Sequence, residues 1–500
     1  MRFWPWSKPK SVKTAAPVMI VRGKYDAAQT TVDNRRHWAA ADGLSPNAAV
    51  NPEVRRTLRN RARYEVANNS YAKGIVLTLA NDTIGTGPRL QMLTQDADAN
   101  RRIEEAFSDW ARAVDLAAKL RTARMARAES GEAFALLTSS PTLDTPVKLD
   151  VRLVEPEQVC TPWTRSARPD GVDGIVFDAA GHPVAYHVLR RHPGDGAFGS
   201  VGVGRAFGGD GYDTLPASAV LHYYRADRPG QWRGIPDITP ALPLFAQLRR
   251  YTLAVLTAAE SAANIAIVMK TNIPAGGEAA EVEPMTEMEM VPNTALFSPE
   301  GWEPSQIKAE HPSTTYGEFK REVLNEIARC LNMPFNVAAG NSSGYNYASG
   351  RLDHQTYFKS LRVEQRHLEV TVLDRVLRAW LAEAVLVEGL LRRGTRTREF
   401  ARQRAIPHGW FWDGVEHVDP AKEAGAQATR LASHTTTLAH EYARQGRDWE
   451  SELRQRAKEL ALMSELGLTQ ATPEVPPEAT PEASDDTPDP DEGEARKEAA

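Results

Sequence analysis

The order of hydrophobic and polar positions divides the 500-residue chain into helical and strand-rich regions. Residues 52–80 and 98–130 have the pattern of helices, with their arginines expected on the solvent side. From Gly131 to Arg225 the pattern changes to short runs that alternate or are rich in β-branched residues, such as VKLDVRLVEP. These runs predict antiparallel strands and hairpins. The first half of the chain is therefore expected to combine helices with sheets.

A long helix is predicted directly after the strand-rich region. Pro240 suits a first helical turn, and the pattern extends to about Ile265, about 37 Å at about 1.5 Å per residue. The later half of this helix carries a row of alanines, and small side chains let another helix approach closely. The alanines are Ala254, Ala258, Ala259, Ala262, Ala263 and Ala266.

A second helix is expected to end before Pro334, because the residue before a proline disfavours helical geometry. Thr315 and Glu318 form a candidate capping box at its start. Its predicted apolar face consists of Phe319, Val323, Ile327 and Leu331.

The last part of the chain is predicted to be helical and then disordered. A helical pattern runs from Leu352 to about Leu391, and two or three further helices follow Pro420. Residues 471–500 carry ten acidic and two basic side chains, repeated prolines and almost no large apolar group. Such a tail cannot bury enough apolar surface to offset chain entropy, so disorder is expected.

Charge is unevenly distributed, although the net charge is only -5. Residues 1–63 carry thirteen basic and four acidic side chains, whereas residues 271–312 carry eight acidic and one basic. The sequence therefore places a strongly acidic segment between its first two long helices.

Composition argues against several classes of protein. No stretch reaches about 18 uninterrupted apolar residues, so a membrane span is not expected, and the amino terminus lacks the apolar run of a signal peptide. Cys160 and Cys330 stand far apart without C-x-x-C spacing, which argues against a disulfide framework or a cysteine zinc site. Both are expected to be core thiols in a reducing compartment.

Residues 340–344, GNSSG, fit the G-x-S-x-G pattern of a hydrolase nucleophile elbow. An elbow serine needs a buried strand before it and a helix directly after it. Here the preceding pattern is helical, and YNYASG delays the next helix. Ser342 is therefore not expected to be a nucleophile, and a serine hydrolase is kept as an alternative.

Other chemical motifs are weak. Residues 194–211 contain eight glycines, and GDGAFG fits G-x-G-x-x-G, but no helix follows to hold a phosphate, which favours a hairpin loop. His182, His187 and His192 lie five apart in a predicted strand region, where neighbouring ones point to opposite faces. We therefore expect no metal, no cofactor and no enzymatic activity.

The order of elements, together with RPGQWRGIP at residues 228–236 and NSSGYNYASGR at residues 341–351, resembles the portal proteins of tailed bacteriophages, specifically the lambda-type family. The similarity extends from about Tyr25 to about Leu468. It implies an α+β portal fold with a mixed wing domain, a long helical stem, a clip insertion and a helical crown, assembled as a ring. Such rings commonly contain twelve subunits and stand at one capsid vertex, where DNA passes during packaging and ejection.

The resemblance also implies how the chain is divided. The expected parts are a basic amino-terminal arm (1–24), the wing (25–235), the first stem helix (236–268), the clip (269–314), the second stem helix (315–333), the tunnel loop (334–351), a long wing helix with its connector (352–415), the crown (416–468) and the acidic tail (469–500).

Three groups of residues gain roles from the resemblance. Residues 334–350 contain no charged side chain, and an uncharged loop lets DNA slide where a basic one would hold its phosphates. The expected tunnel-loop residues are Asn341, Ser342, Ser343, Gly344, Tyr345, Asn346, Tyr347 and Ser349; the terminase-docking clip residues are Glu281, Glu283, Met285, Glu287, Met288 and Glu289; and the stem-packing residues are Ala259 and Ala263.

The implied partners are further copies of the chain, double-stranded DNA in the channel, the large terminase subunit, the major capsid or scaffold protein and the head-completion proteins. The implied location is the portal vertex of the virion, after assembly in the host cytoplasm. In this family the motor is a separate terminase, so no ATPase activity is implied. A conventional DNA-binding protein is the second alternative.

Overall fold

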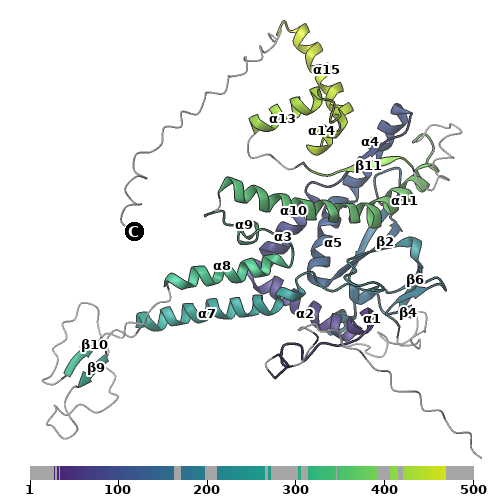
Figure 1. The fold of residues 1–500 in the computed structure, drawn as a ribbon. Coiled ribbons are helices and arrows are strands. Elements are labelled where there is room, and N and C mark those ends of the chain that lie inside the picture. The colour runs from purple at the N-terminus through teal and green to yellow at the C-terminus, as the bar shows by residue number, and fades with distance from the viewer. Residues whose placement is uncertain are drawn as a thin grey trace, which may run out of the picture.

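The computed structural model of the chain combines helices and sheets (Figure 1). Two long helices project from a body of strands and helices, and a separate group of three helices lies above that body in this view. The structure describes residues 28, 31–32, 34–162, 171–197, 211–264, 268–271, 302–305, 313–344, 346–390, 406–414 and 420–468. The expectation of an α+β fold is confirmed.

Four of the first helices form where the sequence predicts them: α2 (Pro52–Asn68), α3 (Ser70–Ile84), α4 (Ala97–Ala113) and α5 (Leu116–Ser130). The short helix α1 (Pro46–Ala49) was not predicted. Asn69 divides the predicted helix of residues 52–80. Its side-chain oxygen accepts hydrogen bonds from the backbone N–H groups of Tyr71 and Ala72, which caps α3 and gives it a new direction.

Two antiparallel sheets follow, and the predicted strands are confirmed. The strands are β2 (Glu132–Ser139), β3 (Leu149–Val154), β4 (Gly171–Val172), β5 (Ile175–Phe177), β6 (Pro183–Leu189), β7 (Tyr212–Pro216) and β8 (Val220–Tyr224). Their order is β3-β2-β8 in one sheet and β4-β5-β6-β7 in the other. In the first sheet, Phe134 of β2 lies opposite both Val154 and His222. Most of the predicted glycine-rich hairpin loop, residues 198–210, lies outside the described residues.

The two projecting helices form an antiparallel hairpin that we call the stem hairpin. It consists of the turn η5 (Thr239–Ala241), α7 (Leu242–Asn264) and α8 (Ser313–Arg329), with β9 (Val268–Thr271) and β10 (Trp302–Ser305) paired beyond the far ends of the helices. Both long helices are confirmed. Residues 272–301, which include every predicted clip residue, lie outside the described part of the chain.

Two details of the second stem helix were predicted wrongly. The helix begins at Ser313, so Thr315 already lies inside its first turn and is not the N-cap of a capping box. Phe319 was expected to share one apolar face with Ile327, yet Ile327 is buried and the Phe319 side chain is 51% exposed. It packs against Tyr251 of α7, with ring centroids 4.9 Å apart, at the open edge of the hairpin.

The long helix predicted from Leu352 is present, but its limits differ. The segments are α9 (Phe335–Ala339), α10 (Tyr347–Leu368), the π-helical turn η6 (Glu369–Leu373) and α11 (Asp374–Ala384). The long helix thus begins at Tyr347, five residues earlier than predicted, and ends at Ala384 rather than near Leu391. The short helix α9 was not predicted, because five residues are too few to show a helical period.

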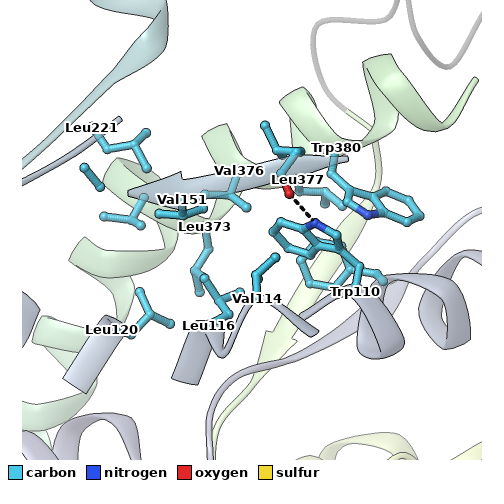
Figure 2. Close-up of a cluster of buried hydrophobic side chains, with 14 of the residues drawn as sticks. Trp110, Val114, Leu116, Leu120, Val151, Leu221, Leu373, Val376, Leu377 and Trp380 are labelled. Carbon is cyan, nitrogen blue, oxygen red and sulfur yellow. Dashed lines mark hydrogen bonds between the residues drawn. The ribbon is translucent and has the colours of Figure 1, made fainter. Parts of the chain in front are cut away.

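The largest apolar core lies between α4, α5, the three-stranded sheet and the end of the long helix (Figure 2). Trp110 and Trp380 are both buried there. The Trp110 indole N–H donates to the backbone oxygen of Leu149 at 2.7 Å, so its polar atom has a partner. Phe107 packs edge-on against Trp380, with ring centroids 5.4 Å apart. This core joins α4 to α11 although some 270 residues separate them in sequence, and it fixes the body as one unit.

Three helices end the described chain, where two or three were predicted. They are α13 (Pro420–Ala432), α14 (Leu438–Arg444) and α15 (Trp449–Glu465). They follow β11 (His408–Phe411), which pairs with β1 (Arg89–Met92), and Gln91 of β1 donates to Asp448 at 2.9 Å. Among the described helices, none is both long and apolar enough for a membrane span.

Candidate functional site

Residues 228–236, RPGQWRGIP, form a loop between β8 and η5 that we call the junction loop; it is exposed at residues 228–230 and mostly buried from Gln231 onward. The Gln231 side chain holds it together: its oxygen accepts from the backbone N–H groups of Asp227 and Arg228 at 3.1 and 3.3 Å, and its nitrogen donates to the Arg233 backbone oxygen at 2.9 Å. Gln231 is 5% exposed. The loop that gave one of the two most specific sequence signals is therefore the connection that sets where α7 leaves the body.

The junction loop is tied to β2 by a buried ion pair. Arg233 is 1% exposed and Glu132 is fully buried, and the guanidinium donates to the Glu132 carboxylate at 2.7 to 3.0 Å. The Gly234 backbone N–H donates to the same carboxylate at 3.1 Å, and His222 lies 3.0 Å from it. Burial alone would raise the pKa of Glu132, but Arg233 and the hydrogen bond from His222 hold it well below its usual value. Glu132 is therefore a buried anion with several donors.

Two glycines let the junction loop pass close to the start of β2. A Cβ atom on Gly234 would lie 2.0 Å from the backbone oxygen of Gly131, and one on Gly131 would lie 2.5 Å from the backbone carbon of Ile235. Gly131 also has a φ of +92°, which disfavours other residues. The two backbones can only approach this closely because both positions lack a side chain.

A second ionic cluster anchors the start of α7 to the long helix. Asp237, directly after the junction loop, accepts from Arg124 at 3.0 Å and lies 3.6 Å from Arg127. Arg127 donates to the Tyr223 hydroxyl at 2.9 Å and pairs with Glu364 of α10. Side chains of α5, β8 and α10 therefore meet at the base of the stem hairpin.

The buried arginines correct a prediction. Arg55 and Arg59 of α2 were expected on the solvent side, but each is 4% exposed, whereas Arg56 is exposed. Arg55 pairs with Asp173, and Arg59 lies 3.4 Å from Glu132. Their spacing in the sequence could have indicated this burial, because the two arginines share a helix face with the buried Ala62 and Val66.

One cluster in the described residues has the composition of a metal site. Ligand atoms of Glu155, Glu157 and His192 lie within 4.8 Å of one another. The Arg63 guanidinium already contacts this cluster, 3.1 Å from a Glu155 oxygen and 3.2 Å from a Glu157 oxygen. The guanidinium of Arg63 therefore balances the negative charge of the two carboxylates. His187, which sequence spacing grouped with His192, instead lies 3.0 Å from the Thr214 hydroxyl.

The predicted tunnel loop is a short exposed tip between α9 and α10. Gly340 ends α9 with a φ of +62°, and the Asn341 side chain accepts from the Ser343 backbone N–H at 2.9 Å. Ser342, Ser343, Gly344 and Asn346 are exposed, while Tyr345 lies outside the described residues. Tyr347 and Ser349 belong to the first turn of α10 rather than to the loop.

The surroundings of Ser342 do not match a nucleophile elbow. The element before it is the helix α9, where an elbow needs a strand. Among the described residues, the Ser342 hydroxyl has no hydrogen bond to a histidine or a carboxylate, the contact that activates a serine.

The two roots of this tip are fixed, in contrast to its exposed residues. The Asn336 side chain of α9 lies 3.0 Å from the ring of His354 in α10. One turn further along α10, Tyr357 is 1% exposed and donates to Asp82 of α3 at 2.8 Å. The exposed tip is therefore carried by rigid elements at both ends.

The alanine row of α7 faces two directions. Ala259 is half-buried and follows Phe245, Leu248 and Val255 at helical spacing, on the face that meets α8. Ala254 and Ala258 are exposed, and they accompany the large exposed side chains Leu253 (59%) and Leu256 (55%). Ala263 lies in α7, and its side chain is not among the described parts of the structure.

Comparison with known proteins assigns this arrangement to a family. The model of the lambda family of phage portal proteins matches residues 33–365. The chain belongs to this family. The match spans the junction loop, the stem hairpin and the tip between α9 and α10, and it ends within α10. These parts of the portal protein are therefore its family-defining portion, and the three terminal helices lie beyond it.

The individual proteins that resemble this chain have low sequence identity to it. The probable portal protein of Halomonas phage phiHAP-1 is 23% identical over 470 residues, which cover 88% of this portal protein and 87% of the relative. A chain from the neck of an empty gene transfer agent (GTA) particle is 14% identical with a TM-score of 0.42, covering 81% of this chain and 94% of its own. A portal protein of the HK97 family from Corynebacterium diphtheriae is 12% identical with a TM-score of 0.31, covering 73% of this chain and 98% of its own.

Proposed function

We propose that this portal protein assembles into a ring, with twelve copies as is common in its family, at one vertex of the capsid. Double-stranded DNA passes through the centre when the genome is packaged and again when it is ejected. The observation that carries the proposal is membership of the portal family over residues 33–365. The exposed side chains of Leu253 and Leu256 support it, because a projecting helix with exposed leucines gains stability from contact with another copy.

The other parts of the proposed role concern partners. The clip between β9 and β10 docks the large terminase subunit and later the head-completion proteins, and the wing contacts the major capsid or scaffold protein. Assembly takes place in the host cytoplasm and the finished ring stays in the virion. The chain itself is not an enzyme, since the motor is the separate terminase.

Imaging of the purified full-length chain tests the central proposal. We expect negative-stain images of rings with a central hole. A monomer that binds DNA tightly and loses affinity as salt rises would instead favour a conventional DNA-binding protein. Labelling of Ser342 by a fluorophosphonate probe would favour a serine hydrolase.

The clip proposal rests on charge and adaptable apolar contact. Glu281, Glu283, Glu287 and Glu289 offer electrostatic steering, and Met285 and Met288 offer side chains that adapt to a partner surface. Replacing the four glutamates by glutamine should weaken terminase binding and flatten its salt dependence. Unchanged affinity at low and moderate salt would reject this placement.

The tunnel-loop proposal rests on the absence of charge between residues 334 and 350. Placing Arg at Ser343 and Asn346 adds about two cations per subunit next to the DNA, and each phosphate contact strengthens binding in a salt-dependent way. Packaging should slow or stall at low salt and recover in part as salt rises. The matched control places Gln at both positions, which adds length without charge and should package normally. Normal speed of the Arg variant at every salt concentration would refute the sliding loop.

A further inference from the structure

The stem hairpin has two different sides. Tyr251 of α7 stacks with Tyr316 of α8 at 5.7 Å and meets the half-exposed Phe319 at 4.9 Å. Leu253 follows Tyr251 by two residues, which turns it by about 200° around α7. Its exposed side chain therefore points away from the aromatic side. One side of the hairpin presents Phe319 and the opposite side presents leucines.

Charged residues accompany each apolar side chain. Arg250 is exposed on α7, one turn before Leu253. On α8, Phe319 is flanked by the exposed Glu318 and Glu322. Within the described part of the chain, none of these three charged side chains forms an ion pair. Around Leu253 the leucine side thus carries the cation Arg250 and the phenylalanine side carries anions, so the two sides are complementary at this level; the exposed Glu260 lies on the leucine side about two turns further along α7.

The complementary groups also lie at matching heights. Tyr251 meets Phe319, so these two residues mark one level of the antiparallel hairpin. Each residue adds about 1.5 Å, which puts Arg250 level with the stretch from Glu318 to Glu322 and Leu253 within about one turn of Phe319. Copies related by rotation about an axis parallel to the stem stay at the same height, so these groups would meet between neighbours.

We infer that the Leu253 side of one stem hairpin packs against the Phe319 side of the next copy, with Arg250 facing Glu322. The inference rests on the proposed ring and names the contact that closes it. A two-fold axis parallel to the stem would instead pair Leu253 with Leu253 and bring Arg250 against Arg250, which is unfavourable. A head-to-tail contact uses both sides of every hairpin, and it closes into a ring when the rotation between copies allows.

Charge reversal tests the pairing. Arg250→Glu and Glu322→Arg should each raise the concentration needed for half-assembly by about tenfold or more, because like charges then face each other. The double variant restores one opposite pair at every interface and should assemble nearly as well as wild type. Sedimentation velocity gives the assembled fraction, and thermal melting checks that each variant is folded. Arg112→Glu is the matched control, since Arg112 of α4 is 77% exposed and lies outside the stem hairpin, and it should not alter assembly.

The outcomes separate this inference from the proposed function. If wild type forms rings and the single reversals assemble equally well, or the double variant is no better than the worse single one, the interface is wrong and the ring stands. If wild type is monomeric at every concentration, both the ring and the interface are refuted.

Disulfide trapping gives an independent measurement. Leu253→Cys combined with Phe319→Cys should yield, on oxidation, a ladder of covalent oligomers in denaturing gels. The two positions lie on opposite sides of one hairpin, so a bond between them joins different copies. Burial raises the pKa of the native Cys160 and Cys330 to about 11, which keeps both thiols unreactive. Each single-cysteine variant is the control, and a monomer band from rings of the double variant would overturn the contact.

Discussion

The junction around Glu132 buries charged side chains, whereas the stem hairpin that leaves it exposes apolar ones. At the junction, Glu132 and Arg233 have partners within the same chain, at 2.7 to 3.0 Å. On the stem hairpin, Leu253 and Phe319 are more than half exposed. The base of the stem is therefore complete within one copy, while its sides leave apolar surface that the proposed ring would cover. The helix α7 is held in place at its start by the junction, and it exposes apolar side chains along its length.

The largest effect is expected where a buried charge loses its partner. Arg233→Met should lower the free energy of unfolding by about 3–5 kcal/mol, because Glu132 stays buried without its main counter-ion. Denaturant unfolding followed by tryptophan fluorescence measures the loss. Arg56→Met is the matched control: Arg56 is 68% exposed and should change stability by less than about 0.5 kcal/mol. A loss for Arg233→Met as small as that of the control would show that the junction does not depend on this pair.

The close approach of two backbones at the junction gives the next effect. Gly234→Ala places a Cβ 2.0 Å from the Gly131 oxygen, so the loop must shift, at a cost of about 1–3 kcal/mol. Gly74→Ala is the control, since a Cβ there meets nothing within 4 Å and Ala favours the helix α3. The two variants should move the denaturation midpoint in opposite directions. A neutral Gly234→Ala would contradict the tight crossing.

Sequence patterns were sufficient for most of the long helices, the strand-rich region and the family, and insufficient for the partners of buried charges. The helix that contains Arg55 and Arg59 was predicted from its own period. The acids that pair with these arginines are Glu132 of β2 and Asp173 in the turn between β4 and β5, both more than 70 residues away. Local periodicity contains no information on such distant pairing, so the arginines were assigned to solvent by their usual preference.

The predictions of helix boundaries and of half-exposed residues were wrong for a related reason. Phe319 fits a buried helical face in sequence, but a two-helix hairpin is too thin to cover it. The start of α10 at Tyr347 was missed because glycine, serine and asparagine dominate this region and favour turns when considered alone. Residues 341–344 and 346 are exposed, but the tunnel-loop role of this segment stays a prediction, as does the role of the clip residues.

A substitution on the inner face of the stem hairpin sharpens the comparison. Ala259 is half-buried on the face toward α8, so Ala259→Arg should separate the two helices and cost about 1 kcal/mol. Ala254 is exposed, and Ala254→Arg should change the stability of the monomer by less than about 0.5 kcal/mol. Thermal melting at a concentration too low for assembly measures both. Equal losses would mean that the two faces of α7 are not distinct.

Acid should weaken the junction through His222. Burial lowers the pKa of His222, although the hydrogen bond to Glu132 opposes this, so the unfolded chain binds a proton more readily than the folded one. Stability is then lost as pH falls below about 6.5, by at most about 1.4 kcal/mol per pH unit for this group. The depressed pKa of Glu132 adds a second loss below about 4.5. His222→Gln keeps a hydrogen-bond donor at this position but does not titrate. The free energy of unfolding of this variant should therefore change less with pH between pH 5 and 7. An unchanged slope would exclude His222 as its source.

The smallest effect is expected at Ser342. This residue is not buried like the charged side chains of the junction, and it does not belong to an exposed apolar surface like that of the stem hairpin. Its hydroxyl is exposed, and the turn is held by the Asn341 side chain instead. Ser342→Ala should therefore change the free energy of unfolding by less than about 0.5 kcal/mol and leave ring formation and packaging unchanged. Asn341→Ala is the informative neighbour, since it removes the bond to the Ser343 N–H and should cost about 0.5–1.5 kcal/mol of local stability. Packaged DNA length against time, with melting of the same preparations, compares the two. If Ser342→Ala forms intact rings that fail to package DNA, the hydroxyl has a chemical role and the proposal of a sliding loop is wrong.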